Sequence, residues 1–206
     1  MGIMNKASRF VGPLVLPKIS YQKRIIDTYT HFYLSEAVER QTVLYESRDG
    51  KSLTDSPFAI FQHLLKTDKK KEYTHYWVVT PGVELKKIQD TYQEHDNVHF
   101  ILRNSDDYLK WLAKAEYLIN NSTFQGFVTI KEEQTYINTW HGTPLKTMGF
   151  DIPGNPANAK NVVRNFFMAD YLISPNPHTT KMFVDSYRLK NNYPGKIIEA
   201  GYPRID

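Results

Sequence analysis

The sequence has 206 residues, of which 41% are hydrophobic and 23% are charged, an ordinary globular composition that excludes disorder over most of the chain. It contains no cysteine, which excludes disulfides, thiolate zinc sites and a cysteine nucleophile and fits a reducing compartment. A transmembrane helix needs about 18 successive apolar residues, and no such run is present. The apolar stretch 10–17 is too short and too interrupted by proline to be a secretory signal.

The basic charge is concentrated in an N-terminal arm, residues 1–24. The arm carries +5 against +4 for the whole chain, which leaves −1 for the remaining residues. With its apolar residues between 10 and 16, the arm predicts a peripheral contact with an anionic membrane surface. The alternatives are a solubilising tail, or a segment that packs on another part of the protein. Nucleic acid is not an expected partner, because most aromatic residues lie within predicted strands and helices and do not alternate with basic ones.

After the arm, hydrophobic periodicity and capping residues predict alternating elements. In chain order these are a helix over 23–40, a strand over 42–46, a helix over 56–66, a strand over 73–79, a helix over 83–92, a strand over 98–102, a helix over 105–114, strands over 116–120 and 135–139, a helix over 159–168, a strand over 171–174, a helix over 177–187 and a strand over 196–200. Residues 149–158 and 188–195 are predicted loops.

This alternation is typical of an α/β protein with a Rossmann-like parallel sheet flanked by helices. We expect a basic arm and helix over 1–40 and a Rossmann-like domain over 41–206. In an open parallel sheet, ligands bind beyond the carboxyl ends of the strands. The residues just past the predicted strand ends are polar and glycine-rich, and they form the stretches 46–50, 80–82, 103–104, 120–122, 140–144, 174–176 and 201–204.

His141 is the leading candidate for a catalytic residue. It follows a strand and precedes Gly142, which allows close approach of a ligand to the backbone. Thr143 offers a hydroxyl and a potential helix cap, and Pro144 suits the first position of a helical turn that would turn its N–H groups toward an anion. A neutral imidazole at this place can take a proton from an alcohol. The alternative is a structural histidine held by hydrogen bonds in a loop.

The remaining motifs mostly exclude other classes. His178, at a predicted helix start, is the only rival histidine, and no His-x-Glu ligand pair occurs in the sequence. The stretch 46–52 lacks the Walker spacing, no GxGxxG follows a strand, and no G-x-S-x-G is present. A nucleotide kinase, a dinucleotide-dependent enzyme and an α/β-hydrolase are therefore disfavoured.

Four stretches resemble one known family. Residues 138–146, Asn-Thr-Trp-His-Gly-Thr-Pro-Leu-Lys, resemble the signature of the CDP-glycerol glycerophosphotransferases of wall teichoic acid synthesis. Residues 45–61 are similar to that family's first strand and helix, and 118–122 and 201–204 fit in order and spacing. The resemblance covers about residues 40–206.

The resemblance implies the first lobe of a two-lobed GT-B fold. Such an enzyme transfers glycerol phosphate, or ribitol phosphate in some members, from a CDP-linked donor to a hydroxyl of a lipid-linked acceptor, and releases CMP. His141 would be the base that activates the acceptor hydroxyl, with Glu46 or Asp49 as candidates to orient its imidazole. Substrate-binding residues are expected at Gly142, Thr143, Asn120, Asn121, Glu46, Ser47, Arg48, Asp49, Lys146 and Arg204. No metal and no bound cofactor is expected beyond CDP-glycerol as donor substrate.

The sequence departs from the family in one respect, since it ends at Asp206, where the second lobe is expected to begin. CDP would bind mainly in that lobe, so we expect this chain by itself to be inactive. Three hypotheses stay open: half of a glycerophosphotransferase at the cytoplasmic face of the membrane, a non-catalytic module that binds the acceptor or a partner lobe, and a lobe of another GT-B glycosyltransferase. Ribitol as the transferred group and an oligomeric state stay open as well.

Overall fold

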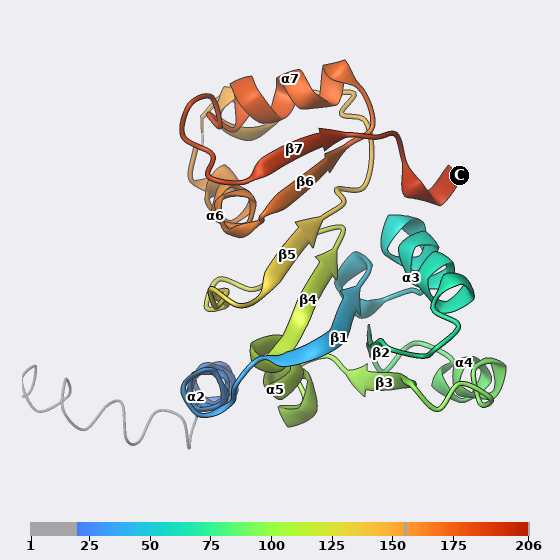
Figure 1. Ribbon diagram of the computed structural model, residues 1–206. Helices are drawn as coiled ribbons and strands as arrows, with labels where there is room; N and C mark the ends of the chain where they lie inside the picture. The colour runs from blue at the N-terminus through green and yellow to red at the C-terminus, as the bar shows by residue number, and fades with distance from the viewer. Residues whose placement is uncertain (1–19, 155, 206) are drawn as a thin grey trace, which may run out of the picture.

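The architecture was described from a computed structural model, which covers residues 20–154 and 156–205. The chain forms a seven-stranded sheet in the order β3-β2-β1-β4-β5-β6-β7 (Figure 1). Each neighbouring pair of strands is parallel. The strands are β1 (Glu39–Glu46), β2 (Thr74–Val79), β3 (Val98–Leu102), β4 (Ala115–Asn120), β5 (Thr135–Asn138), β6 (Tyr171–Ser174) and β7 (Lys196–Glu199). The predicted Rossmann-like parallel sheet is therefore confirmed, and the strand order reverses between β1 and β4, where such sheets bind ligands.

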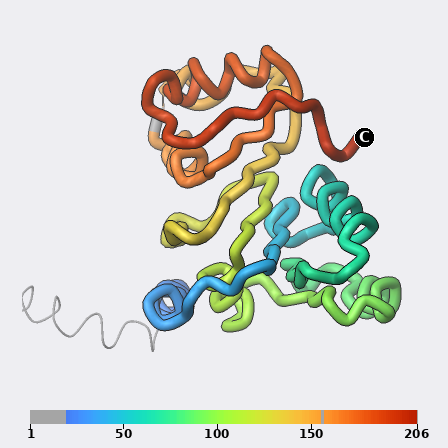
Figure 2. Tube along the Cα trace, in the orientation of Figure 1, coloured from blue at the N-terminus to red at the C-terminus, as the bar shows by residue number. Residues whose placement is uncertain are grey.

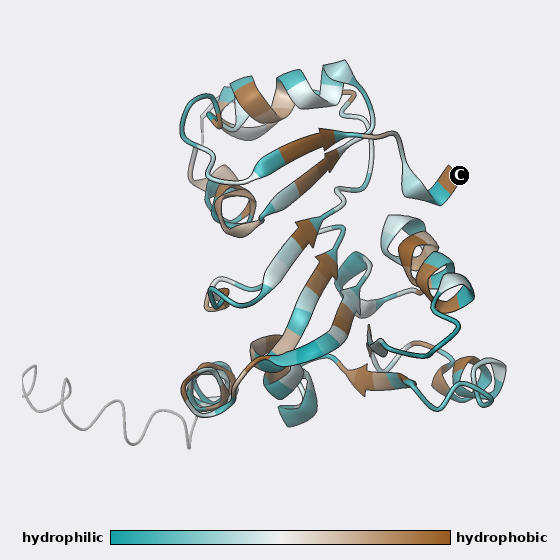
Figure 3. Cartoon of the chain, viewed as in Figure 1, coloured by the Kyte–Doolittle hydropathy of each residue, from teal (hydrophilic) through white to brown (hydrophobic). Residues whose placement is uncertain are grey.

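Helices cover the two faces of the sheet unequally. One face packs α2 (Tyr21–Ser35), α5 (Asp106–Lys114), α6 (Lys160–Met168) and α7 (Pro177–Ser186) into the larger core cluster. The other face packs α3 (Asp55–Thr67) around Tyr45, Phe61 and Trp77, and α4 (Leu85–Thr91) leads to Tyr92, which packs on Phe61. Figure 3 shows hydrophobic residues on the strands and in bands on helices such as α3 and α7, in agreement with apolar area buried between layers.

Short 3₁₀ turns complete the structure. They are η1 (Arg48–Gly50), η2 (Gly149–Asp151), η3 (Pro156–Ala159) and η4 (Pro203–Ile205). The Cα trace in Figure 2 brings η4 back beside α3, so residues far apart in the sequence meet there. Residues 121–134, between β4 and β5, contain no helix, and their Phe124 and Val128 enter the core in its place.

The first predicted helix differs from the structure. It was expected over 23–40, but α2 ends at Ser35 and β1 already begins at Glu39. The reason is pairing with β4: Glu39 pairs with Ala115, and Arg40 forms an ion pair with Glu116 at 2.8 Å. Strand pairing thus takes precedence over a helical pattern at residues 36–40. Most of the predicted arm, residues 1–19, lies outside the described residues.

None of the described helices has the length and the apolar character that a membrane crossing requires. The described residues also contain no group of three or more acidic or histidine side chains that could hold a metal ion.

Candidate active site

A polar pocket of about 460 Å³ lies at the carboxyl edge of the sheet. Its lining residues come from η1, the start of α3, the end of β4 and the segment after β5: Arg48, Asp49, Lys51, Asp55, Asn121, Ser122 and His141. The pocket therefore sits beside the β1–β4 reversal, where the order of the strands predicts it.

His141 is exposed to this pocket through one nitrogen of its ring. Its Nδ1 lies 2.7 Å from the main-chain oxygen of Asn121. A carbonyl oxygen can only accept a hydrogen bond, so the neutral ring carries its proton on Nδ1. Its Nε2 has no partner among the described residues and keeps its lone pair. This tautomer is the one that a general base requires.

The residue before His141 is anchored in the core. Trp140 has a φ of 53°, a left-handed conformation that is uncommon for a residue with a side chain, and it is 4% exposed. Its indole packs at 4.2 Å between ring centroids on the His141 imidazole, and edge-to-face on Phe166 and Phe183. The aromatic packing of the larger core cluster thus fixes the point from which His141 projects.

Asn121 joins three walls of the pocket. Its side-chain oxygen accepts from the main-chain N–H of Arg48 at 3.0 Å, and its side-chain nitrogen donates to Ser47 at 3.2 Å and to Asp55 at 3.0 Å. Gly50 closes the η1 turn with a φ of 77°, and a Cβ there would lie 3.3 Å from the backbone of Val79. The turn therefore needs glycine, as the strand-to-loop transition in the sequence suggests.

Two cations face the pocket without a partner. The side chains of Arg48 and Lys51 form no ion pair or hydrogen bond with the described part of the chain, whereas Arg204 is bound to Asp55 at 2.8 Å. Unpaired cations beside an imidazole favour an anionic ligand.

Glu46 belongs to a separate buried cluster. It is 0% exposed, accepts from Arg103 at 3.2 Å and from Tyr108 at 3.0 Å, and Arg103 also reaches Asp49 at 3.5 Å. Burial raises the pKa of Glu46, while Arg103 and Tyr108 oppose that shift. The expectation that Glu46 or Asp49 orients the imidazole of His141 is wrong, because the oxygen of Asn121 occupies that nitrogen.

The other predicted site residues fall into four groups. Asn121, Arg48 and Asp49 line the pocket with His141, and Arg204 reaches the main-chain oxygen of His141 at 3.2 Å. Ser47 and Asn120 are buried behind the pocket, where the side chain of Asn120 accepts from the N–H of Ser122. Gly142 has open space around it. Lys146 and the rival His178 line a different hollow, in which His178 lies 3.2 Å from the main-chain oxygen of Pro144.

Thr143 does not cap a helix, because residues 141–148 form bends and irregular backbone. Its hydroxyl instead lies 2.6 Å from the Tyr202 hydroxyl and accepts from Asn176 at 3.2 Å. Those two contacts hold the hydroxyl toward the C-terminal turn, so the predicted helical turn after His141 is wrong.

Two pocket residues were missed by the sequence analysis, namely Lys51 and Asp55, whereas Ser122 belongs to the predicted stretch 120–122. Lys51 directly follows the predicted stretch 46–50, so a margin of one residue would have included it. Asp55 follows no strand, and its only signal in the sequence is its place at the start of a helix, before Ser56 and Pro57.

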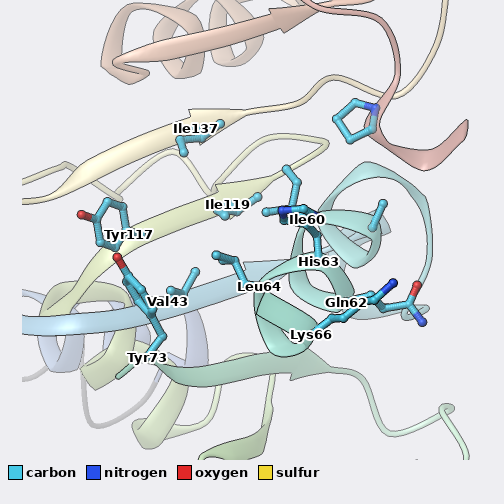
Figure 4. Close-up of a pocket in the computed structure, with 12 residues that line it drawn as sticks. Val43, Ile60, Gln62, His63, Leu64, Lys66, Tyr73, Tyr117, Ile119 and Ile137 are labelled. Atoms are coloured by element: carbon cyan, nitrogen blue, oxygen red, sulfur yellow. The ribbon is translucent and has the colours of Figure 1, made fainter. Parts of the chain in front are cut away.

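A larger pocket of about 620 Å³ lies between α3 and the sheet, but its walls are mainly apolar. Figure 4 shows Val43, Ile60, Leu64, Ile119 and Ile137 around it, with the hydroxyls of Tyr73 and Tyr117 at one side. It contains no predicted site residue, and the chemistry is concentrated in the smaller pocket.

A Rossmann-like domain with an exposed histidine and two unpaired cations at the carboxyl edge of its sheet is suited to an anionic ligand. The chain belongs to the family described as CDP-Glycerol:Poly(glycerophosphate) glycerophosphotransferase, which matches residues 28–206. The resemblance noted in the sequence is thereby confirmed.

Several relatives carry names from teichoic acid synthesis. The chain is 32% identical to the teichoic acid poly(glycerol phosphate) polymerase of Bacillus subtilis (strain 168), over 99% of this chain and 27% of the relative. It is 30% identical to the teichoic acid glycerol-phosphate transferase of Staphylococcus aureus (strain NCTC 8325 / PS 47), over 89% of this chain and 47% of the relative.

Solved structures of the wall teichoic acid polymerase TagF share the fold. One aligns with a TM-score of 0.70 and 28% identity over 97% of this chain and 47% of the TagF chain. Another TagF structure was obtained after a 15-minute soak with CDPG. The chain thus spans less than half the length of these relatives.

Proposed function

We propose that this chain is the acceptor-side lobe of an enzyme that transfers glycerol phosphate from CDP-glycerol to a hydroxyl of a lipid-linked acceptor in wall teichoic acid synthesis. The observation that carries the proposal is the bond from His141 Nδ1 to the oxygen of Asn121, which leaves Nε2 as a base at the pocket. The family match and the names of the relatives support the donor and the reaction.

In this reaction, Nε2 of His141 takes the proton of the acceptor hydroxyl as its oxygen attacks phosphorus. A new phosphorus–oxygen bond joins the glycerol phosphate to the acceptor, and the bond to the CMP phosphate breaks, so that CMP leaves with the electron pair. Arg48 and Lys51 are placed to attract the transferred phosphate, which remains charged throughout. The cytidine part of the donor would be held by residues outside this chain.

The test is His141→Ala in a protein that joins this chain to a donor-binding half. We expect kcat to fall about 10²–10⁴-fold, because an alcohol attacks a phosphodiester poorly unless a base takes its proton. Affinity for CDP-glycerol and the melting temperature should change little. The matched control is His178→Ala, which removes an exposed imidazole from the other hollow. A near-normal kcat, or a loss of fold that accounts for the lost rate, would defeat the assignment.

The second candidate function is a non-catalytic lobe that binds the acceptor or a partner. Calorimetric titration of CDP-glycerol, with and without a separately made donor lobe, separates the two. Heat that appears only with both lobes, together with CMP release, supports the enzyme, and binding without CMP release supports the module. The same assays with CDP-ribitol decide between the two transferred groups.

The proposal places the protein at the cytoplasmic face of the membrane, with the basic arm on anionic lipid. The charge of residues 1–24 supports this placement. Removing these residues should weaken sedimentation with anionic vesicles at low salt, and added salt should weaken binding of the full chain, because ions screen surface charges. Equal sedimentation of both proteins at low salt would remove the arm from the proposal.

A further inference from the structure

Asp55 combines an unusual backbone with a crowded carboxylate. It begins α3 with a φ of 68°, which residues with a side chain seldom adopt. Its side chain is 13% exposed and lines the His141 pocket. One carboxylate oxygen accepts from the N–H of Ser56 at 2.8 Å and from Arg204 at 2.8 Å, and the other accepts from Asn121 at 3.0 Å. Such a backbone persists only where its surroundings enforce it, and it often marks a functional site.

Both long-range partners of Asp55 also hold His141. Arg204 donates to the main-chain oxygen of His141 at 3.2 Å with the same nitrogen that binds Asp55. Asn121 receives the Nδ1 proton of His141 on its main-chain oxygen and binds Asp55 through its side chain. Asp55, Arg204, His141 and Asn121 thus form a closed ring of contacts, and each comes from a separate segment of the chain. Asp55 is the anionic member of this ring.

We propose that Asp55 is the positioning residue of this site, whose carboxylate fixes Asn121 and Arg204 and thereby fixes both the imidazole and the main chain of His141. This inference rests on the proposed function of His141 as a base. Residues 141–148 form no helix or strand, so the place of the ring depends on contacts from neighbouring segments. A reacting group displaced by about 1 Å can lose about 10²-fold in rate.

Asp55→Asn tests the proposal, since it keeps the shape of the side chain and removes its charge. The first readout is the tautomer of His141, measured from the ¹⁵N shifts of its ring in this chain above neutral pH. We expect the wild-type ring to be protonated on Nδ1 alone and the variant ring to average between the two tautomers. A residue that only starts a helix would leave this signature unchanged.

The second readout is kinetic, in a protein that also carries a donor-binding half. Asp55→Asn should lower kcat about 10–100-fold with KM for CDP-glycerol within about twofold, because donor contacts stay intact. The matched control is Asp151→Asn, which removes the anion of another Asp–Arg pair, at 2.7 Å from Arg188, away from the pocket. That control should keep both the His141 tautomer and kcat.

An Asp55→Asn variant with a fixed Nδ1-protonated ring and kcat within about twofold of wild type would overturn the proposal. If this variant melts below the assay temperature, Arg204→Gln decides by the same readouts, with smaller effects expected because Asn121 keeps its bond to Asp55. Should His141→Ala itself retain its rate, the proposed function fails, while the ring tautomer still reports whether Asp55 positions His141.

Discussion

Two polar clusters lie at the carboxyl edge of the sheet and differ in what they leave unpaired. Around Glu46, the carboxylate, Arg103 and Tyr108 satisfy one another, and Glu46 is completely buried. Around His141, one ring nitrogen is bound and the other is open to a pocket with two unpaired cations. Both clusters contain charged residues that follow strands, so position in the sheet alone does not separate a structural group from a reactive one.

The difference teaches that the reactive cluster is recognised by a polar atom that lacks a hydrogen-bond partner. A buried polar group with all partners in place adds stability and specificity to the fold. A group that is oriented by one hydrogen bond, with its second site free, is prepared for an incoming molecule. Asp49 touches both clusters, since it pairs with Arg103 and lines the His141 pocket.

The largest expected effect tests the structural role of Glu46. Glu46→Ala leaves Arg103 and Tyr108 without their buried partner, so we expect the free energy of unfolding to fall by about 3–5 kcal/mol. His141→Ala should change it by less than about 1 kcal/mol, because that ring is exposed. Denaturant titration of both variants provides the measurement.

Glu46→Gln is the matched control, since it can still accept from Tyr108 and should lose less stability than Glu46→Ala. An alanine variant as stable as the wild type would mean that Glu46 is not a structural anchor. Its place beside Asp49 would then favour a direct role at the pocket.

A smaller effect on stability is expected at a second histidine, which is buried where His141 is exposed. His75 is completely buried, and burial lowers its pKa from 6.5 to about 4. Below pH 6.5 the unfolded chain takes up a proton that the folded ring refuses, so stability falls as the pH drops from 6.5 to about 4. The loss over that window is roughly 3 kcal/mol.

Denaturation at about pH 7.5 and about pH 4 measures this loss, and His75→Phe should remove its share. Nε2 of His75 has no partner, but Nδ1 lies 3.1 Å from the Tyr45 hydroxyl, which His75→Phe leaves unpaired. The variant should therefore be less stable at both pH values, and the test is the difference between the two values. His178→Ala, at an exposed ring, should show the wild-type loss. An identical pH dependence in His75→Phe would contradict the assignment.

Much of the fold could be predicted from the sequence, because strand and helix periods are local. The strands over 98–102 and 171–174 were predicted with their bounds as the structure has them. The end of the first helix could not be predicted, since Glu39 and Arg40 are recruited by Ala115 and Glu116 from a strand far along the chain. Long-range pairing of this kind leaves no local trace in the sequence.

The site could be predicted only in part. His141 and its neighbours past the strand ends follow from the rule for parallel sheets, and the structure brings Arg48, Asp49 and Asn121 to the same pocket. The partner of the imidazole could not be predicted, because it is a main-chain oxygen and any residue carries one. Lys146 was expected at the site because it ends the stretch 138–146 that resembles the family signature, but the irregular backbone after His141 carries it to another hollow.

The aromatic anchor at Trp140 has a consequence for engineering the protein. His141 directly follows Trp140 in the chain, and the indole of Trp140 packs on Phe166 and Phe183. Libraries that repack this part of the interior for heat resistance would also tilt the base, so their members should be ranked by turnover as well as by thermal tolerance. Conversely, the exposed segment that carries Leu145 offers attachment points for a reporter dye, because Leu145 is 97% exposed.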